Sequence, residues 1–324
     1  MHEPVAAISC TGVTKVYATG ALALQDLTLT IPRGASFGLL GANGAGKSTF
    51  VRLALGFIRP TTGEVRVLGE VAVQRAHPRV GYVPERVPAE RRFTARRYLA
   101  YLGQLAGLWG AANRQRVAAV LEEVGLAEAA DARVETYSKG MLQRLGIAQA
   151  LLPDPDLLIL DEPTGGLDPA SQWAIRRAIA ARRRRGATIL LCSHYLAEVE
   201  ELCDAIGILH RGHLALSGAL ADLVRREGMA DLLLGGDRPA RDVCAEAGIA
   251  PLIVAAEGQR VRFPTHAQPP ILAALVDQQV PIVSLTLVQQ SLEEVYLRAT
   301  EASTGADAGV APATHTPAVP TPAL

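Results

Sequence analysis

One stretch, Gly41–Thr49, constrains this chain more than any other. It reads Gly-Ala-Asn-Gly-Ala-Gly-Lys-Ser-Thr and fits the pattern G-x-x-x-x-G-K-[ST]. The residues before it, Ser36–Leu40, suit a short buried strand, and Lys47–Leu55 after it suit a helix. A strand, a glycine-rich turn and a helix N-terminus together aim successive backbone N–H groups at one point. The stretch therefore predicts an α/β fold with a phosphate-binding loop.

The side chains of this loop indicate what it binds. Lys47 can reach the β- and γ-phosphates of a nucleotide, and the Ser48 hydroxyl can bind Mg²⁺. The backbone of the whole loop is expected to surround the phosphates. Its members are Gly41, Ala42, Asn43, Gly44, Ala45, Gly46, Lys47, Ser48 and Thr49.

The composition bounds the class of protein. A chain of 324 residues that is 49% hydrophobic can form about two domains. Lys+Arg and Asp+Glu balance at 32 each, so the overall charge does not favour nucleic acid as the partner. No stretch approaches about 18 uninterrupted apolar residues, and the N-terminus lacks a signal-peptide pattern. We expect a cytosolic protein whose thiols are reduced and buried, namely Cys10, Cys192, Cys203 and Cys244.

Acidic and imidazole side chains follow two apolar strands. Leu157–Leu160 leads into Asp161 and Glu162, and Ala187–Cys192 leads, after one serine, into His194. The carboxyl ends of parallel strands meet at one edge of a sheet, beside the phosphate loop. We expect Asp161 to bind Mg²⁺, Glu162 to orient or deprotonate the attacking water, and His194 to contact a phosphate.

Two further side chains are candidates by position. Tyr17 follows the first of two alternating strands, Ile8–Val16 and Leu22–Ile31, and its ring could stack on adenine or belong to the core. Glu85 stands where the strand Arg79–Pro84 ends. Both lie on segments that the α/β arrangement can bring to the phosphate loop.

Residues 86–150 read as a helical insertion. Two stripes with three- and four-residue spacing predict its core, and Ser138 suits the N-cap of a helix that runs to about Leu152. The stripes are Tyr98, Tyr101, Leu102 and Leu105, then Val117, Val120, Leu121 and Val124.

Two arginine clusters allow two interpretations each. Arg182–Arg185 closes a helix, which favours a solvated face over a polyanion site. A second cluster near Glu85 is either solvated or a docking surface for a partner. Its members are Arg86, Arg91, Arg92, Arg96 and Arg97.

The chain divides into three parts by composition. Residues 1–218 carry all the motifs described above, whereas residues 219–300 suggest a small α+β accessory domain without a chemical motif. Residues 301–324 are rich in Ala, Pro and Thr and are expected to form a disordered tail.

Six motifs together resemble those of the ATPase subunits of ATP-binding cassette (ABC) transporters, in the family's order and over about two thirds of the chain. They resemble the A-loop, Walker A, signature, Walker B, D-loop and H-loop at Tyr17, Gly41–Thr49, Tyr137–Met141, Leu157–Glu162, Gly166–Asp168 and His194. Family membership would imply a P-loop NTPase fold with an antiparallel β subdomain and a helical insertion. It would also imply ATP and Mg²⁺ as ligands.

The resemblance implies partners as well. Two copies would close head to tail around two nucleotides, so that Ser138 and Gly140 contact the γ-phosphate of an ATP held by the opposite copy. Asp168 of the D-loop would lie at the same nucleotide. Lys47, Glu162 and His194 would carry the hydrolysis. A separate integral membrane permease would place the subunit on the inner face of the cell membrane.

The chain departs from the family pattern at two places. The signature, usually L-S-G-G-Q, reads Tyr-Ser-Lys-Gly-Met at Tyr137–Met141. Together with Ser291–Tyr296, this variant looks like the exporter branch whose permeases are of the ABC-2 type. Glu85 stands where the family's Q-loop normally carries Gln, and its carboxylate can still approach Mg²⁺.

Three other classes of nucleotide-binding protein fit the sequence less well than a transport ATPase. Chromosome-associated ABC ATPases place a very long coiled coil between the P-loop and the signature, and the segment from Gly41 to Ser138 is too short for one. Ribosome-associated types carry two cassettes in one chain, and here there is one. A nucleotide-binding module without turnover conflicts with the presence of Glu162 and His194.

Overall fold

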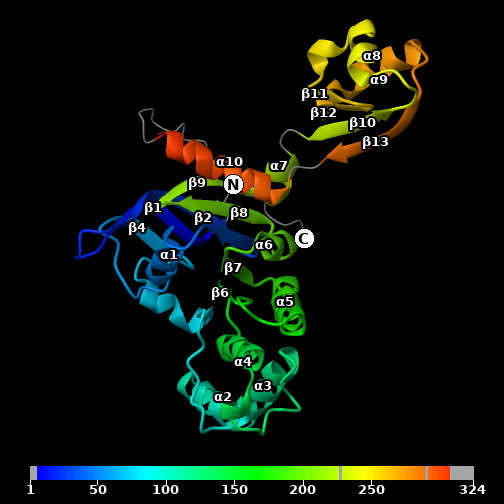
Figure 1. The fold of residues 1–324 in the computed structure, drawn as a ribbon. Coiled ribbons are helices and arrows are strands. Elements are labelled where there is room, and N and C mark those ends of the chain that lie inside the picture. The colour runs from blue at the N-terminus through cyan, green and yellow to red at the C-terminus, as the bar shows by residue number, and fades with distance from the viewer. Residues whose placement is uncertain (1–5, 226–227, 289–290, 307–324) are drawn as a thin grey trace, which may run out of the picture. The chain divides into compact units, whose positions relative to one another are not determined.

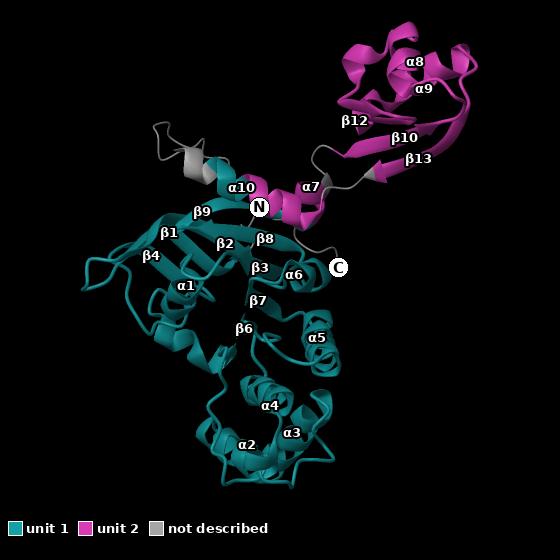
Figure 2. Cartoon of the chain, in the orientation of Figure 1, with its two compact units in different colours: residues 1–220, 299–324 teal, residues 221–298 magenta. Residues whose placement is uncertain are grey.

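The computed structural model describes residues 6–225, 228–288 and 291–306. The chain divides into two compact units, of which the second is residues 221–298 and the first is the remainder (Figure 2). All the motifs from Tyr17 to His194 therefore lie in the first unit.

The first unit is built on a six-stranded sheet of order β5-β6-β7-β3-β8-β9 (Figure 1). Neighbouring strands are parallel except β9, which runs antiparallel to β8. The strands are β3 (Ser36–Leu40), β5 (Val80–Val83), β6 (Leu157–Asp161), β7 (Thr188–Ser193), β8 (Ala205–His210) and β9 (His213–Ala219). Because β3, β6 and β7 are buried along their whole length, they are central parallel strands, which confirms the α/β class.

A three-stranded antiparallel sheet of order β2-β1-β4 accompanies the parallel one. It comprises β1 (Ala6–Val16), β2 (Leu22–Pro32) and β4 (Thr62–Val67). One hydrophobic core joins this sheet to α1 (Lys47–Ala54) and to the parallel sheet, with Phe37 and Phe50 almost fully buried in it. The antiparallel subdomain is thus confirmed, and it packs directly against the helix that follows the phosphate loop.

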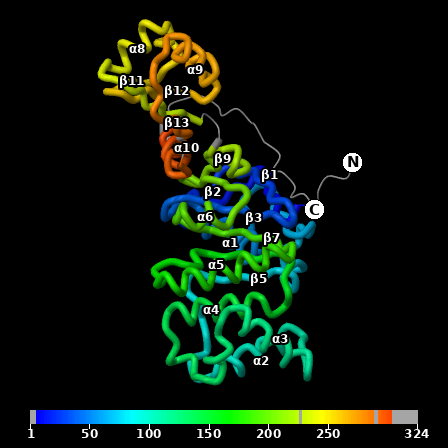
Figure 3. Tube along the Cα trace, turned by 90° about the vertical axis from the view of Figure 1, so that its right-hand side faces the viewer, coloured from blue at the N-terminus to red at the C-terminus, as the bar shows by residue number. Residues whose placement is uncertain are grey.

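Three helices form the insertion and lie together at the end of the first unit farthest from β1, β2 and β4 (Figures 1 and 3). They are α2 (Ala95–Leu105), α3 (Gly110–Glu123) and α4 (Lys139–Leu151). The stripe Val117, Val120, Leu121 and Val124 is buried, as predicted.

The other predicted stripe is wrong at two positions. Tyr101 is 52% exposed and Leu105 is 68% exposed. Tyr98 of the predicted stripe is buried, but the other buried residues of α2 are Ala95, Leu99 and Gly103 at four-residue spacing, so the inward face is rotated from the predicted one. Apolar spacing alone did not indicate which of the two overlapping rows faces the core.

The helices α5 (Pro169–Arg184) and α6 (Leu196–Leu202) complete the first unit. The expectation of a solvated face at the end of α5 is wrong for Arg182, whose side chain is 4% exposed. Its guanidinium donates to both carboxylate oxygens of Glu123 at 2.7 Å and to Asp154 at 2.6 Å. Glu123 ends α3 and Asp154 follows α4, so a buried ion network ties the end of α5 to the helical insertion.

The second unit holds an antiparallel sheet of order β11-β12-β10-β13. Its strands are β10 (Met229–Leu234), β11 (Ala255–Glu257), β12 (Arg260–Pro264) and β13 (Ile282–Val288). The helices α8 (Ala240–Glu246) and α9 (Gln268–Asp277) share a separate hydrophobic core with the sheet. This unit is an α+β arrangement.

Two helices lie where the chain passes between the units, α7 (Leu220–Arg225) and α10 (Leu292–Ala306). The tail was expected to be disordered from residue 301. That expectation is wrong for 301–306, which continue α10, and residues 307–324 lie outside the described part of the chain.

The predicted state of the thiols is confirmed, because all four cysteines are free and buried. Among the described residues, no helix combines the length and apolar character that crossing a bilayer requires.

Candidate nucleotide site

The phosphate loop is held tightly between β2 and β8. Gly46 has a φ of 114°, and a Cβ there would lie 2.7 Å from the backbone oxygen of Ala23 on β2. A Cβ on Gly41 would lie 2.6 Å from the backbone oxygen of Leu209 on β8. Only glycine fits at both positions. Gly46 is also the N-cap of α1 and offers no side-chain cap, so the N–H groups of the first helical turn face the loop uncapped.

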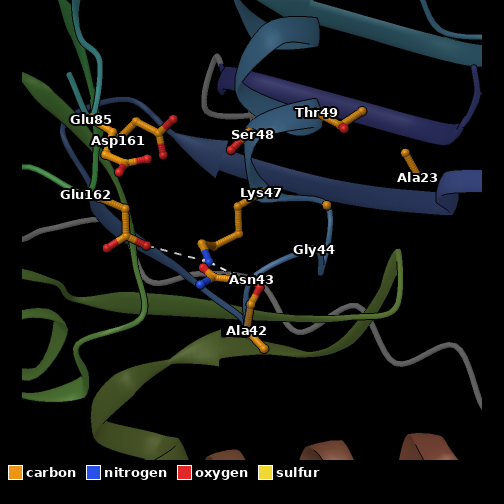
Figure 4. Close-up of a pocket in the computed structure, with 11 residues that line it drawn as sticks. Ala23, Ala42, Asn43, Gly44, Lys47, Ser48, Thr49, Glu85, Asp161 and Glu162 are labelled. Atoms are coloured by element: carbon orange, nitrogen blue, oxygen red, sulfur yellow. Dashed lines mark hydrogen bonds and ion pairs between the residues drawn. The ribbon is translucent and has the colours of Figure 1, made fainter. Parts of the chain in front are cut away.

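A pocket opens above this loop. Figure 4 shows Glu85 and Asp161 side by side on one wall and the loop residues opposite them. The lining is Ala23, Ala42, Asn43, Gly44, Gly46, Lys47, Ser48, Thr49, Glu85, Asp161 and Glu162. The geometry thus brings the loop, the end of β6 and the end of β5 to one place. We refer to it as the P-loop pocket.

Glu162 lies between a cation and an imidazole. Its Oε1 is 3.6 Å from Nζ of Lys47, and its Oε2 is 2.7 Å from Nδ1 of His194. Lys47 is 7% exposed and also donates to the backbone oxygen of Gly41 at 2.5 Å. The side chain of His194 is 44% exposed. His194 does not line the P-loop pocket but contacts Glu162, which does, and its ring lies 4.0 Å from the ring of Tyr195, measured between centroids.

The backbone of Glu162 is strained. Its φ of 51° lies in the left-handed region, which costs a residue with a Cβ roughly 1–3 kcal/mol. Its N–H donates to the backbone oxygen of Cys192 on β7 at 2.9 Å, which holds the turn in place. The strain lets the chain leave β6 sharply, so that successive carboxylates, Asp161 and Glu162, both reach the P-loop pocket.

The charge on Asp161 is poorly compensated by the protein alone. Burial, which is the largest cause, and the carboxylates of Glu162 and Glu85 together raise the pKa of Asp161 from 3.8 to about 6, against a lowering effect of Lys47. A divalent cation would relieve this repulsion, and the hydroxyl of Ser48 lines the same pocket.

The donor set can be compared with what Mg²⁺ requires. Within the described residues, no group of three or more His, Cys, Asp or Glu side chains could hold a metal ion by itself. Mg²⁺ binds through one or two carboxylates and keeps its other positions for water and substrate phosphate. The residues present therefore fit Mg²⁺ held by Asp161 and Ser48, with Glu85 close by.

Tyr17 lies at the margin of the site. Its hydroxyl is 3.2 Å from Oγ1 of Thr49, and this contact is the main cause that lowers the pKa of Tyr17. Nζ of Lys15 lies 5.6 Å from the centre of the ring. Tyr17 does not line the P-loop pocket, but it contacts a residue that does. The ring is only partly buried and is not a core side chain.

The remaining predicted residues form a second group, which we call the signature surface: Ser138, Gly140 and Asp168. Ser138 caps α4 by accepting from the N–H of Met141, and Asp168 caps α5 by accepting from the N–H of Ser171 at 2.9 Å. A Cβ on Gly140 would lie 2.1 Å from Oγ of Ser171, so this glycine lets α4 and α5 meet. None of the three lines the P-loop pocket.

Sequence reasoning missed two contributors. Ala23 lines the pocket, but a small apolar residue on a strand gives no signal of such a role. Ser171 fixes Asp168, since its hydroxyl also donates to Oδ2 of Asp168 at 2.6 Å. An Asp followed three residues later by a hydrogen-bonding side chain is a helix-cap pattern, so Ser171 could have been found.

The fold and the pocket define a P-loop nucleotide-binding protein. A family profile described as ABC transporter matches residues 24–165. An ABC transporter ATP-binding protein of Synechocystis is 36% identical over 299 residues, covering 88% of this chain and 82% of the relative. The Nod factor export ATP-binding protein I of Ralstonia nicotianae is 34% identical over 304 residues, covering 90% of this chain and 93% of the relative.

A solved structure shares the fold. It is a dimeric ATP-binding cassette in a post-hydrolysis state bound to ADP and phosphate, with a TM-score of 0.61 and 23% identity over 66% of this chain and 98% of that one. The chain described here belongs to the ATP-binding subunits of ABC transporters. Its P-loop is accordingly an ATP-binding loop.

Proposed function

We propose that the chain hydrolyses ATP in the P-loop pocket with Glu162 as the general base. The observation that carries this proposal is the position of the Glu162 carboxylate, 3.6 Å from Lys47 and 2.7 Å from His194. A water beside Glu162 would give it a proton while the water oxygen attacks the γ-phosphorus. The bond from the γ-phosphorus to the bridging oxygen then breaks, and ADP leaves.

The chain's own cations and dipoles would stabilise this step. Lys47 and the N–H groups at the start of α1 meet the negative charge on the phosphates. His194 contacts Glu162 and would hold its carboxylate toward the water. When bound, Mg²⁺ would neutralise phosphate charge, and Asp161, Ser48 and Glu85 are the side chains that would hold it.

Two copies of the chain are proposed to share each nucleotide. In support, the signature surface lies outside the P-loop pocket of its own subunit. Ser138 is exposed at the N-terminus of α4, where the helix dipole favours an anion. A head-to-tail partner would bring this helix end to the γ-phosphate. The related cassette of similar fold is dimeric.

The nucleotide cycle is proposed to drive a separate membrane permease in the direction of export. In support, a relative that covers most of this chain and of itself is a Nod factor export ATP-binding protein, and the signature variant at Tyr137–Met141 looks like the same branch. The arginines beside Glu85 belong to a part of the chain where Phe93 and Tyr101 are also exposed. Arg96 is already paired with Asp131, whereas the exposed apolar rings would suit a permease with apolar groups. Docking of this segment on the permease would place the subunit on the inner face of the membrane.

The test of the hydrolytic proposal is Glu162→Gln. The amide keeps the shape of the side chain but cannot accept the proton, so ATP binding should persist while turnover falls by more than about 100-fold. A matched control is Glu201→Gln, which alters an exposed carboxylate paired with Arg176. ATP binding is measured at equilibrium, and hydrolysis by phosphate release. Turnover of Glu162→Gln within about tenfold of the parent would exclude Glu162 as the principal base.

A further inference from the structure

A second carboxyl group, that of Glu198, takes no part in the chemistry proposed for Glu162. Glu198, on α6, is 0% exposed, and its Oε2 lies 2.9 Å from Oγ of Ser193. Burying a carboxyl group is costly unless it is hydrogen-bonded. Burial is the main cause that raises the pKa of Glu198, against lowering effects of Ser193 and Thr164. The complete burial of this carboxyl group therefore requires a structural or functional reason.

The partner of Glu198 holds the turn that carries His194. Ser193 is the last residue of β7, and its Oγ accepts a hydrogen bond from the N–H of Tyr195 at 3.0 Å. A hydroxyl has one hydrogen, so Ser193 can donate to Glu198 and accept from Tyr195 at the same time. The bond from Tyr195 joins the residues on either side of His194, and the bond to Glu198 ties this turn to α6. Together they hold the backbone that carries His194.

The bond to Ser193 is what anchors the carboxyl group of Glu198. Oε1 of Glu198 has no hydrogen-bond partner of good geometry within the described part of the chain, so Oε2 alone holds the group, through Ser193. Thr164, two residues after Glu162, is buried and lowers the pKa of Glu198. The geometry therefore ties Glu198 to the turn that carries His194.

We propose that Glu198 is a positioning residue that holds the turn 193–195 through Ser193, and so sets the 2.7 Å contact between His194 and Glu162. The proposal rests on the proposed role of Glu162 in hydrolysis. Glu198 itself touches neither the P-loop pocket nor a phosphate-binding residue. Its effect is therefore expected in the chemical step and not in ATP binding.

The test compares Glu198→Ala with Glu198→Gln in the full chain. Displacement of a reacting group by about 1 Å can cost about 100-fold in rate, so Glu198→Ala should lower kcat by at least about 30-fold with KM within about threefold of the parent. Glu198→Gln retains an acceptor for the Ser193 hydroxyl and should restore kcat to within about threefold. Glu201→Ala, on the exposed side of α6, is the matched control and should leave kcat unchanged.

A double-mutant cycle with Ser193→Ala separates positioning from general loss of stability. If Glu198 acts through Ser193, the double variant should lose no more kcat than the worse single variant. Additive losses, a Glu198→Ala kcat within threefold of the parent, or no recovery in Glu198→Gln would overturn the proposal. If Glu198→Ala does not fold, Glu198→Gln and Ser193→Ala still decide it, since the first should be active and the second slow.

Measuring Glu162→Gln in the same series distinguishes the two proposals. Full activity of Glu198→Ala beside an inactive Glu162→Gln would reject the positioning role alone. An active Glu162→Gln would reject the hydrolytic role of Glu162 and, with it, the basis for this inference.

Discussion

The P-loop pocket and the signature surface belong to the same unit, yet they are organised in opposite ways. In the pocket, Lys47 from α1 meets Asp161 and Glu162 from the end of β6, and their charges are only partly balanced by one another. At the signature surface, Ser138 and Asp168 each cap a helix within their own chain. The P-loop pocket is concave and its charges are not balanced within the protein, whereas the signature surface consists of two capped helix ends.

This difference supports the proposal that the two regions contribute different groups to one nucleotide site. The pocket has the groups needed to bind phosphate, but its outer side has no second wall of N–H donors within the lining described here. The signature surface supplies such a helix end but no pocket of its own. In the proposed dimer, each region is half of a site, and the signature surface of a second copy completes the P-loop pocket.

The largest effects should come from damaging the two halves separately. Lys47→Ala and Ser138→Arg should each lower hydrolysis by about 10³-fold or more, because each removes charge stabilisation from the same transition state. Only Lys47→Ala should also weaken ATP binding to the isolated subunit. Equilibrium binding at low protein concentration checks this contrast. Equal loss of ATP affinity in both variants would show that Ser138 belongs to the P-loop pocket of its own subunit. The contrast between that pocket and the signature surface would then be wrong.

A smaller effect is expected at the margin of the pocket. Tyr17→Ala should weaken ATP binding by about 1–3 kcal/mol, the range for stacking of a base on an aromatic ring. Tyr17→Phe keeps the ring but loses the contact with Thr49, so it should bind nearly as well as the parent. Affinities from fluorescence or calorimetry measure the difference. Unchanged affinity in folded Tyr17→Ala would remove Tyr17 from the site.

The charge imbalance of the pocket predicts a dependence on pH. The pKa of Asp161 is raised from 3.8 unfolded to about 6 folded, so its contribution to stability is present below pH 3.8 and is lost as pH rises through about 6. A cation favours the ionised form, so Mg²⁺ affinity should fall by about tenfold per pH unit below about pH 6. Asp161→Asn should remove the Asp161 part of this dependence while ATP's own titration remains. The same pH profile in both proteins would contradict this account.

The sequence was most informative where the chemistry is local. The phosphate loop and the pair Asp161 and Glu162 are contiguous segments, so strand and helix signals around them predicted their place in the fold. Arg182 was misjudged because its partners, Glu123 and Asp154, lie in distant segments of the chain. No short-range pattern records such a pairing.

Other features required the three-dimensional arrangement. The strand order places β3 between β7 and β8, which sequence order does not show. Glu198 reads as one of several acidic residues on a short helix, and only its complete burial distinguishes it from Glu201. Tyr101 and Leu105 were wrongly predicted to be buried because two apolar rows overlap on α2.

The central claim, that two copies share each site, is tested most directly by the ATPase rate per subunit as a function of protein concentration, with the association state followed by sedimentation in the same samples. The rate per subunit should rise with concentration and level off as the ATP-bound dimer saturates, and Ser138→Arg should abolish the rise. A constant rate per subunit in samples that remain strictly monomeric would contradict the shared site.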